Sequence, residues 1–155
     1  MKCLVWRASL IVVGGAALGL LANAISPRGI PLVPPPMTAE AVRKDIVSLA
    51  EARQAWESGS ALFLDARNTI DYAAGHIPNA LNLPAEQFDV FFPRVAPMLT
   101  PEMAVVVYCD GEQCDLSHEV QAKLRGLGFK NVRVLVNAWT VWKRAGLSGN
   151  TGDQP

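Results

Sequence analysis

Short apolar runs alternate with amphipathic segments over most of the chain after residue 46. Each apolar run is bounded by turn residues, which predicts buried strands at 61–65, 80–83, 103–108 and 132–136. The intervening patterns predict helices at 48–58, 68–74, 85–99, 115–126 and 138–145, the first opened by a capping box of Ser48 and Glu51. Strands that alternate with helices indicate a parallel sheet covered on both faces. The predicted fold class is therefore α/β, a three-layer sandwich.

The first 25 residues follow a different pattern. Lys2 and Arg7 precede an uncharged apolar run over 8–22, and Ala22-Asn23-Ala24 is similar to a signal-peptide cleavage site. Two interpretations stay open: a transmembrane signal-anchor, slightly favoured, or a cleaved signal. Lys2 and Arg7 would keep the N-terminus in the cytoplasm in both cases. The predicted location is a bacterial-type inner membrane, single-pass, with the domain on the periplasmic side, or a soluble periplasmic domain after cleavage.

Composition and proline content set the predicted domain organisation. Half of the residues are hydrophobic, and Lys plus Arg (14) balances Asp plus Glu (14), which argues against disorder and against nucleic acid as a partner. The proline-rich stretch over 26–36 predicts a stiff spacer. The predicted parts are a membrane segment at 1–25, a spacer at 26–37, one globular domain at 38–148 and a disordered tail at 149–155.

The candidate for chemistry is Cys109, which directly follows the strand predicted at 103–108. Ligands of parallel sheets bind beyond the carboxyl ends of the strands, and N–H groups of a loop and a first helical turn stabilise a thiolate. The predicted active-site loop comprises Asp110, Gly111, Glu112, Gln113 and Asp115, together with Cys114. The alternative for Cys109 is a buried packing role.

Several segments in order resemble the rhodanese-like domain family over about 46–147: Leu64-Asp65-Ala66-Arg67, GHIPNALNLP at 75–84, Val107-Tyr108-Cys109, LGFKNV at 127–132, and Trp142. The resemblance implies a five-stranded parallel sheet between helices. It also implies sulfur transfer, in which Cys109 takes sulfane sulfur from a small donor as a persulfide and passes it to a thiol acceptor, without a cofactor. Asp65 and Arg67 are expected to support the wall of the site as an ion pair, and His76 to stabilise its turn.

The chain departs from the family pattern at two places. The loop carries Asp110, Glu112 and Asp115, with no Lys or Arg from 109 to 122, where family members that act on thiosulfate often have a cation. Carboxylates repel a dianionic donor, so thiosulfate is a doubtful substrate. Asn137-Ala138 stands where the family often has two glycines.

Cys114 lies five residues after Cys109, at the far end of the same loop. A curled loop can bring its ends within disulfide range. Cys114 is therefore a candidate resolving thiol, a redox partner of Cys109 or a small packing residue. No metal site is predicted, because Cys109, Cys114 and His118 offer three ligands in a spacing that fits no usual zinc pattern.

Two function classes follow from these observations. The first is a sulfurtransferase or persulfide-handling thiol enzyme, favoured by the cysteine. The second is a non-catalytic rhodanese-like binding or redox-sensing module at the membrane, favoured by the acidic loop and by Asn137-Ala138. The sequence identifies neither the donor nor a protein partner.

Overall fold

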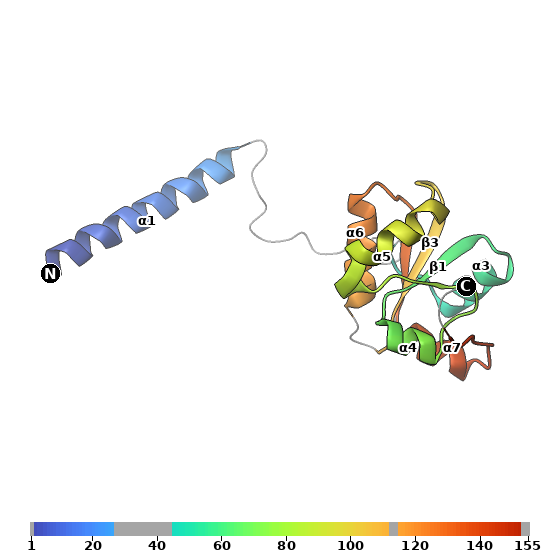
Figure 1. Ribbon diagram of the computed structural model, residues 1–155. Coiled ribbons are helices and arrows are strands. Elements are labelled where there is room, and N and C mark those ends of the chain that lie inside the picture. The colour runs from blue at the N-terminus through green and yellow to red at the C-terminus, as the bar shows by residue number, and fades with distance from the viewer. Residues whose placement is uncertain (1, 27–44, 112–114, 153–155) are drawn as a thin grey trace. The chain divides into compact units, whose positions relative to one another are not determined.

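The computed structural model describes residues 2–26, 45–111 and 115–152 (Figure 1). The chain divides into two units, residues 1–37 and 38–155. The described part of the first unit is the helix α1 (Lys2–Ile25) and Ser26. The predicted spacer at 26–37 otherwise lies outside the described residues.

A helix that crosses a bilayer needs about 20 consecutive apolar residues. Among the described residues, no helix combines the length and the apolar character that a membrane crossing requires. The predicted transmembrane segment is therefore not supported.

The second unit alternates helices and strands as the apolar pattern predicts. Ser48 caps the first helix of the unit: its side chain accepts from the Glu51 N–H, and the Glu51 carboxylate accepts from the Ser48 N–H at 2.9 Å. The elements are α3 (Leu49–Glu57), β1 (Ala61–Asp65), α4 (Thr69–Ala74), β2 (Leu81–Asn82), η1 (Ala85–Gln87), α5 (Phe88–Val95), η2 (Ala96–Met98), β3 (Ala104–Tyr108), α6 (Leu116–Gly126), β4 (Val132–Leu135) and α7 (Ala138–Arg144).

The described strands form a four-stranded sheet in the order β2-β1-β3-β4, and all of its neighbours are parallel. The prediction of five strands is corrected. Beside β4, Ile46 makes a single parallel bridge with Val134, and the Val47 N–H donates to the Val134 carbonyl oxygen at 2.9 Å. Ser48 then caps α3, so the helix begins too soon after Ile46 for the described chain to continue this bridge as a strand.

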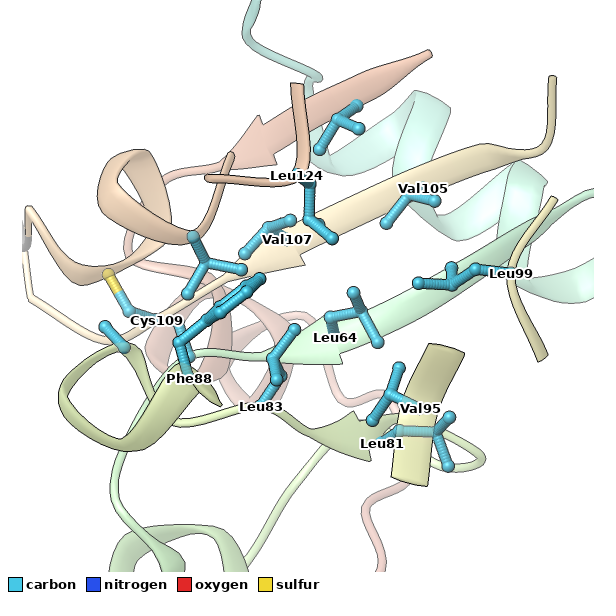
Figure 2. Packing of buried hydrophobic residues seen from close by; sticks show 14 residues of the cluster. Leu64, Leu81, Leu83, Phe88, Val95, Leu99, Val105, Val107, Cys109 and Leu124 are labelled. Atoms are coloured by element: carbon cyan, nitrogen blue, oxygen red, sulfur yellow. The ribbon is translucent and has the colours of Figure 1, made fainter. Parts of the chain in front are cut away.

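Alternation along the strands builds two apolar layers, one on each face of the sheet. Leu64, Val105 and Val107 pack with Val120 and Leu124 of α6 and with Phe88 and Val95 of α5. Phe63, Val106 and Tyr108 pack with Ala52 of α3 and with Ala138 and Trp142 of α7. Cys109 lies at one end of the first layer and Leu99 at the other (Figure 2). The three-layer α/β architecture is confirmed.

The end of the domain differs from the predicted disordered tail at 149–155. Asn150 pairs with His76 through two backbone hydrogen bonds of 2.9 and 3.0 Å, and the Gly152 N–H donates to the Ala73 carbonyl oxygen at 2.8 Å. These bonds tie residues 150–152 to α4 and the turn that follows it. Residues 153–155 lie outside the described residues.

Candidate active site at the carboxyl end of the sheet

Cys109 directly follows β3, at the carboxyl edge of the sheet, and is 1% exposed. Its Sγ lies 3.3 Å from the Oγ of Ser117, a buried residue in the first turn of α6. The Ala138 N–H donates to the Cys109 carbonyl oxygen at 3.0 Å, which fixes the backbone at the strand end. A hydroxyl next to the sulfur can donate a hydrogen bond to a thiolate or a persulfide.

Ser117 was not among the residues predicted for the site. It follows Cys109 by eight positions, and the packing of α6 against β3 brings the two side chains together. A usable signal was nevertheless present, because a small hydroxyl residue in the first turn of the helix predicted after the loop faces the start of that loop.

Cys109 is disulfide-bonded. The described residues do not include the side chain of either of the other cysteines, Cys3 and Cys114. The predicted loop residues Glu112, Gln113 and Cys114 lie outside the described residues. The role predicted for Cys114 stays a prediction.

The start of the loop is held by α7 rather than turned toward the sulfur. Gly111 has a φ of 91°, and its N–H donates to Asn137 Oδ1 at 3.0 Å and to Asp110 Oδ1 at 3.2 Å. Asp110 Oδ1 also accepts from the Thr140 N–H in the first turn of α7 at 3.0 Å. The expectation that loop N–H groups point at the sulfur is therefore wrong for Gly111, whose N–H is already bonded to two oxygens.

Asp115 is the N-cap residue of α6 and is exposed. Its backbone is helical, with φ −81° and ψ −12°, and its side chain makes no capping hydrogen bond. A carboxylate at this end of a helix interacts favourably with the helix dipole. The Asp115 carboxylate therefore partly neutralises the positive end of the α6 dipole, which would otherwise stabilise a thiolate at Cys109.

Asp65 and Arg67 form a buried, bidentate ion pair at the end of β1. Arg67 donates through Nε and Nη2 to the two Asp65 oxygens, the shortest contact being 2.6 Å, and Nη2 also donates to the Gly75 carbonyl oxygen at 2.7 Å. Burial alone would lower the pKa of Arg67, but the hydrogen bonds and the charge of Asp65 outweigh it and raise that pKa. Through these contacts the pair connects the end of β1 to the turn at Gly75.

Tyr108 and His76 both make contacts that hold the turn after α4 in place. The Tyr108 hydroxyl accepts from the Ile77 N–H at 3.1 Å, and burial, reinforced by the charge of Asp65, raises the pKa of Tyr108 far above its ordinary value. The His76 ring stacks on Tyr72 with 3.8 Å between ring centroids, and its Nδ1 lies 2.9 Å from the Tyr72 carbonyl oxygen. His76 thus has the structural surroundings of a turn-stabilising residue.

Asn82, at the end of β2, was also missed by the sequence analysis. Its Nδ2 donates to the carbonyl oxygens of Asp65 at 3.0 Å and of Arg67 at 2.8 Å, and the side chain is 1% exposed. It therefore joins the carboxyl ends of the two neighbouring strands. An Asn in a predicted buried strand was the available signal, since a buried amide needs partners.

A cavity of about 90 Å³ opens at the same edge of the sheet. Its lining residues are Ala66, Asn68, Thr69, Pro84, Ala85, Glu86, Gln87 and Leu116. A larger cavity, of about 530 Å³, lies at the opposite edge, where β1, β3 and β4 begin. The smaller cavity is the one near Cys109, because the N–H of Ala66, which lines it, donates at 2.8 Å to the carbonyl oxygen of Tyr108, the residue before Cys109. Within the described residues no cluster of His, Cys, Asp and Glu has the composition of a metal site.

The comparisons with known proteins agree with this architecture. The family model described as "Rhodanese-like domain" matches residues 48–145. The human single-domain sulfurtransferase TSTD1 is 28% identical, with a TM-score of 0.55, over 64% of this chain and 95% of that one. The BH2092 protein of Bacillus halodurans, 22% identical over 70% of this chain and 78% of its own, has the same fold with a TM-score of 0.61.

Two curated relatives are larger proteins. The HTH-type transcriptional regulator Rv0324 of Mycobacterium tuberculosis is 34% identical over 110 residues, which are 70% of this chain and 46% of the regulator. The tRNA uridine(34) hydroxylase of Cronobacter sakazakii is 31% identical over 91 residues, 57% of this chain and 25% of the hydroxylase. This chain therefore spans less than half of either relative's length.

Proposed function

This chain belongs to the rhodanese-like domain family, and we propose that its domain is a sulfurtransferase in which Cys109 carries sulfane sulfur as a persulfide to a thiol acceptor. The observation that supports this most is the place of the Cys109 sulfur, at the carboxyl end of β3 and 3.3 Å from the Ser117 hydroxyl. A thiolate there attacks the donor sulfur, the bond from that sulfur to the rest of the donor breaks, and its electron pair leaves with the donor remnant. The Ser117 hydroxyl donates to the Cys109 sulfur before the attack and can donate to the persulfide that forms.

Thiosulfate is not the donor in this proposal. The described part of the loop carries Asp110 and Asp115, and Arg67, the cation at the end of β1, is neutralised by Asp65. A dianion would therefore meet carboxylates without a free cation from these residues. A polysulfide or a persulfide is the donor class that fits.

We propose Cys114 as the partner of Cys109 in the disulfide. A Cys114 thiolate would attack the Cys109 sulfur of the persulfide, the bond to the outer sulfur would break, and that sulfur would leave with the electron pair as hydrosulfide. The product is a Cys109–Cys114 disulfide, and a thiol reductant must open it before the next cycle. The disulfide at Cys109 is consistent with this resolved state.

The test begins with protein reduced by dithiothreitol, freed of reductant and treated with inorganic polysulfide. Intact-mass and peptide mass spectrometry should find one added sulfur atom on Cys109, and the Cys109→Ser variant should take up none. A Cys114→Ser variant should hold the added sulfur longer than the wild type, while Cys3→Ser should behave as the wild type. Reduced wild-type protein that gains no sulfur on Cys109 contradicts the proposal.

A redox-sensing module is the second candidate. It is favoured by the burial of Cys109 in a disulfide and by the hydrogen bonds that hold Gly111 and Asp110 against α7. A relative that is a transcriptional regulator shows that this kind of domain also occurs in regulatory proteins. The same experiment separates the two: a module would open and close its disulfide reversibly but would take no sulfur from the donor.

We further propose that the domain works in an oxidising compartment such as the periplasm. Disulfides persist in such compartments and are rare in the cytosol, and Cys109 is disulfide-bonded. Trapping of free thiols in intact cells with a permeant alkylating reagent tests this. Cys109 that is alkylated throughout the population, with no disulfide fraction, in freshly quenched cells contradicts it.

A further inference from the structure

We propose that the cavity beside Cys109 binds the carrier end of an amine-bearing organic persulfide, with Glu86 as the residue that selects its charge. The cavity is formed by the segments that follow β1 and β2, by the start of α4 and by the start of α6. All of these segments meet at the carboxyl edge of the sheet, where Cys109 also lies. This inference rests on the proposed sulfur transfer at Cys109.

The inner wall of the cavity is shared with the reactive cysteine. Ala66 and Ala85 line it and pack in the same buried cluster as Cys109, and Leu116 lines it immediately before Ser117. The Ser117 hydroxyl in turn lies 3.3 Å from the Cys109 sulfur. Ala66 follows β1 at the level where Cys109 follows β3, since the Ala66 N–H donates to the Tyr108 carbonyl oxygen at 2.8 Å, so a carrier held in the cavity lies next to the strand end that bears the sulfur.

The rim of the cavity is polar, and among the described lining residues Glu86 is the charged one. The other polar lining residues are Asn68, Thr69 and Gln87. Asn68 is occupied as the N-cap of α4, where its Oδ1 accepts from the Asp71 N–H at 2.8 Å. Glu86 and Gln87 are exposed, and among the described residues their side chains have no hydrogen-bond partner, so both are available to a ligand.

The cations near the cavity are already engaged. Arg67 is bound to Asp65 and to the Gly75 carbonyl oxygen. Lys123 pairs with Glu119 at 2.7 Å and donates to the Ala85 carbonyl oxygen at 3.0 Å. Within the described part of the lining, an anionic ligand would therefore meet the Glu86 carboxylate as the charged group, whereas an ammonium group would gain an ion pair with it.

The reaction that this site serves is balanced without an outside oxidant. The Cys109 thiolate attacks the outer sulfur of a persulfide R–S–SH, the donor S–S bond breaks, and its electron pair leaves with R–S⁻, which takes up a proton from water. The new S–S bond joins Cys109 to the transferred sulfur. Dithiothreitol supplies the reduced Cys109 beforehand and is removed before the donor is added.

The experiment compares two donors that differ in charge, the persulfides of cysteamine and of mercaptopropionate. The rate of sulfur loading on Cys109 is followed by quenched-flow mass spectrometry. Wild-type protein should load about fivefold faster from the cysteamine persulfide, the factor expected for one solvent-exposed ion pair. Glu86→Gln should remove this preference, and Glu86→Lys should reverse it.

The matched control is Glu102→Gln, which removes an exposed carboxylate at the opposite edge of the sheet, before β3. It should keep the wild-type preference. Equal rates for the two donors in wild-type protein, or an unchanged preference in Glu86→Gln, overturn the inference while leaving sulfur transfer at Cys109 intact. Loading from neither donor, together with none from polysulfide, overturns the proposed function itself.

Discussion

Asn137 accepts a hydrogen bond from Gly111, with 3.0 Å between the Gly111 nitrogen and Asn137 Oδ1. Asn137 has a left-handed backbone, with φ 50° and ψ 38°, and directly precedes α7. This is a position that glycine fills without strain and that Asn tolerates better than other residues. Asn137 therefore keeps the backbone geometry that a glycine would provide, and its side chain adds a bond that holds the active-site loop.

Substitution of Asn137 separates the backbone requirement from the side-chain bond. Asn137→Gly loses the hydrogen bond to Gly111 and keeps the left-handed backbone, whereas Asn137→Ala loses the bond and also strains the backbone. We expect the alanine variant to be less stable than the glycine variant by about 1–2 kcal/mol in free energy of unfolding. Urea denaturation of the reduced proteins measures this difference. Equal stability of the two variants contradicts the role given to the left-handed backbone.

The ion pair of Asp65 and Arg67 should matter far more than an exposed pair of the same chemistry. Arg67→Met leaves the Asp65 carboxylate buried without its partner, which should cost about 3–5 kcal/mol of stability. Arg53→Met breaks the exposed pair with Glu57, at 2.7 Å, and should cost about 0.5 kcal/mol or less. Urea denaturation of both variants at neutral pH makes the comparison. Similar losses in the two variants would show that the buried pair is not a main support of the site.

Tyr108 should make stability fall at alkaline pH. Its pKa in the folded protein is raised by burial and by Asp65, so above pH ~10 the unfolded chain releases the phenol proton while the folded protein keeps it. The unfolded state then binds fewer protons, and this tyrosine's contribution to the free energy of unfolding falls by about 1.4 kcal/mol per pH unit.

The measurement for Tyr108 is a comparison with Tyr108→Phe between pH 9 and 11. The variant loses the hydrogen bond from Ile77 and is less stable at pH 9, but the stability gap to the wild type should close as the pH rises. Other titrating groups are common to both proteins and cancel in the difference. A gap that stays constant across this range would mean that the phenol ionises equally in the folded and unfolded states.

Gly75 should be intolerant of a side chain because Trp139 packs against it. A Cβ at Gly75 would lie 2.6 Å from Cζ2 of Trp139, so Gly75→Ala must displace the indole and should cost about 1–3 kcal/mol. Gly126→Ala is the control, since a Cβ there meets no atom within 4 Å and lies in the last turn of α6, where alanine is the better helix former. Thermal denaturation should show a lower Tm for the first variant only; a lowered Tm in both points to a general effect of removing glycine.

Local patterns predicted the elements well, and the departures come from contacts that no local pattern contains. Short apolar runs place the described strands because each run is buried on both faces, and the capping box of Ser48 and Glu51 marks the start of α3. The fifth strand was implied by the family resemblance and not by an apolar run, and the described residues beside β4 form a single bridge from Ile46 to Val134 before Ser48 caps α3. Ser117 was missed because its contact with Cys109 depends on how α6 packs against β3, which the spacing of eight residues does not determine.

The hydroxyl of Ser117 should act on the chemistry of Cys109 more than on stability. Ser117→Ala removes the hydrogen-bond donor that lies 3.3 Å from the sulfur and replaces it with a group of similar size. In the reduced protein we expect sulfur uptake from polysulfide to slow by about fivefold, which corresponds to the loss of about 1 kcal/mol from one hydrogen bond. The pH profile of Cys109 alkylation should also move to higher pH, because the thiolate loses a donor that favours it.

The control is Ser60→Ala, which removes an exposed hydroxyl immediately before β1 and should leave both measurements unchanged. If Ser117→Ala lowers stability but keeps the alkylation profile and the uptake rate, the hydroxyl is a packing partner of the sulfur and takes no part in sulfur transfer.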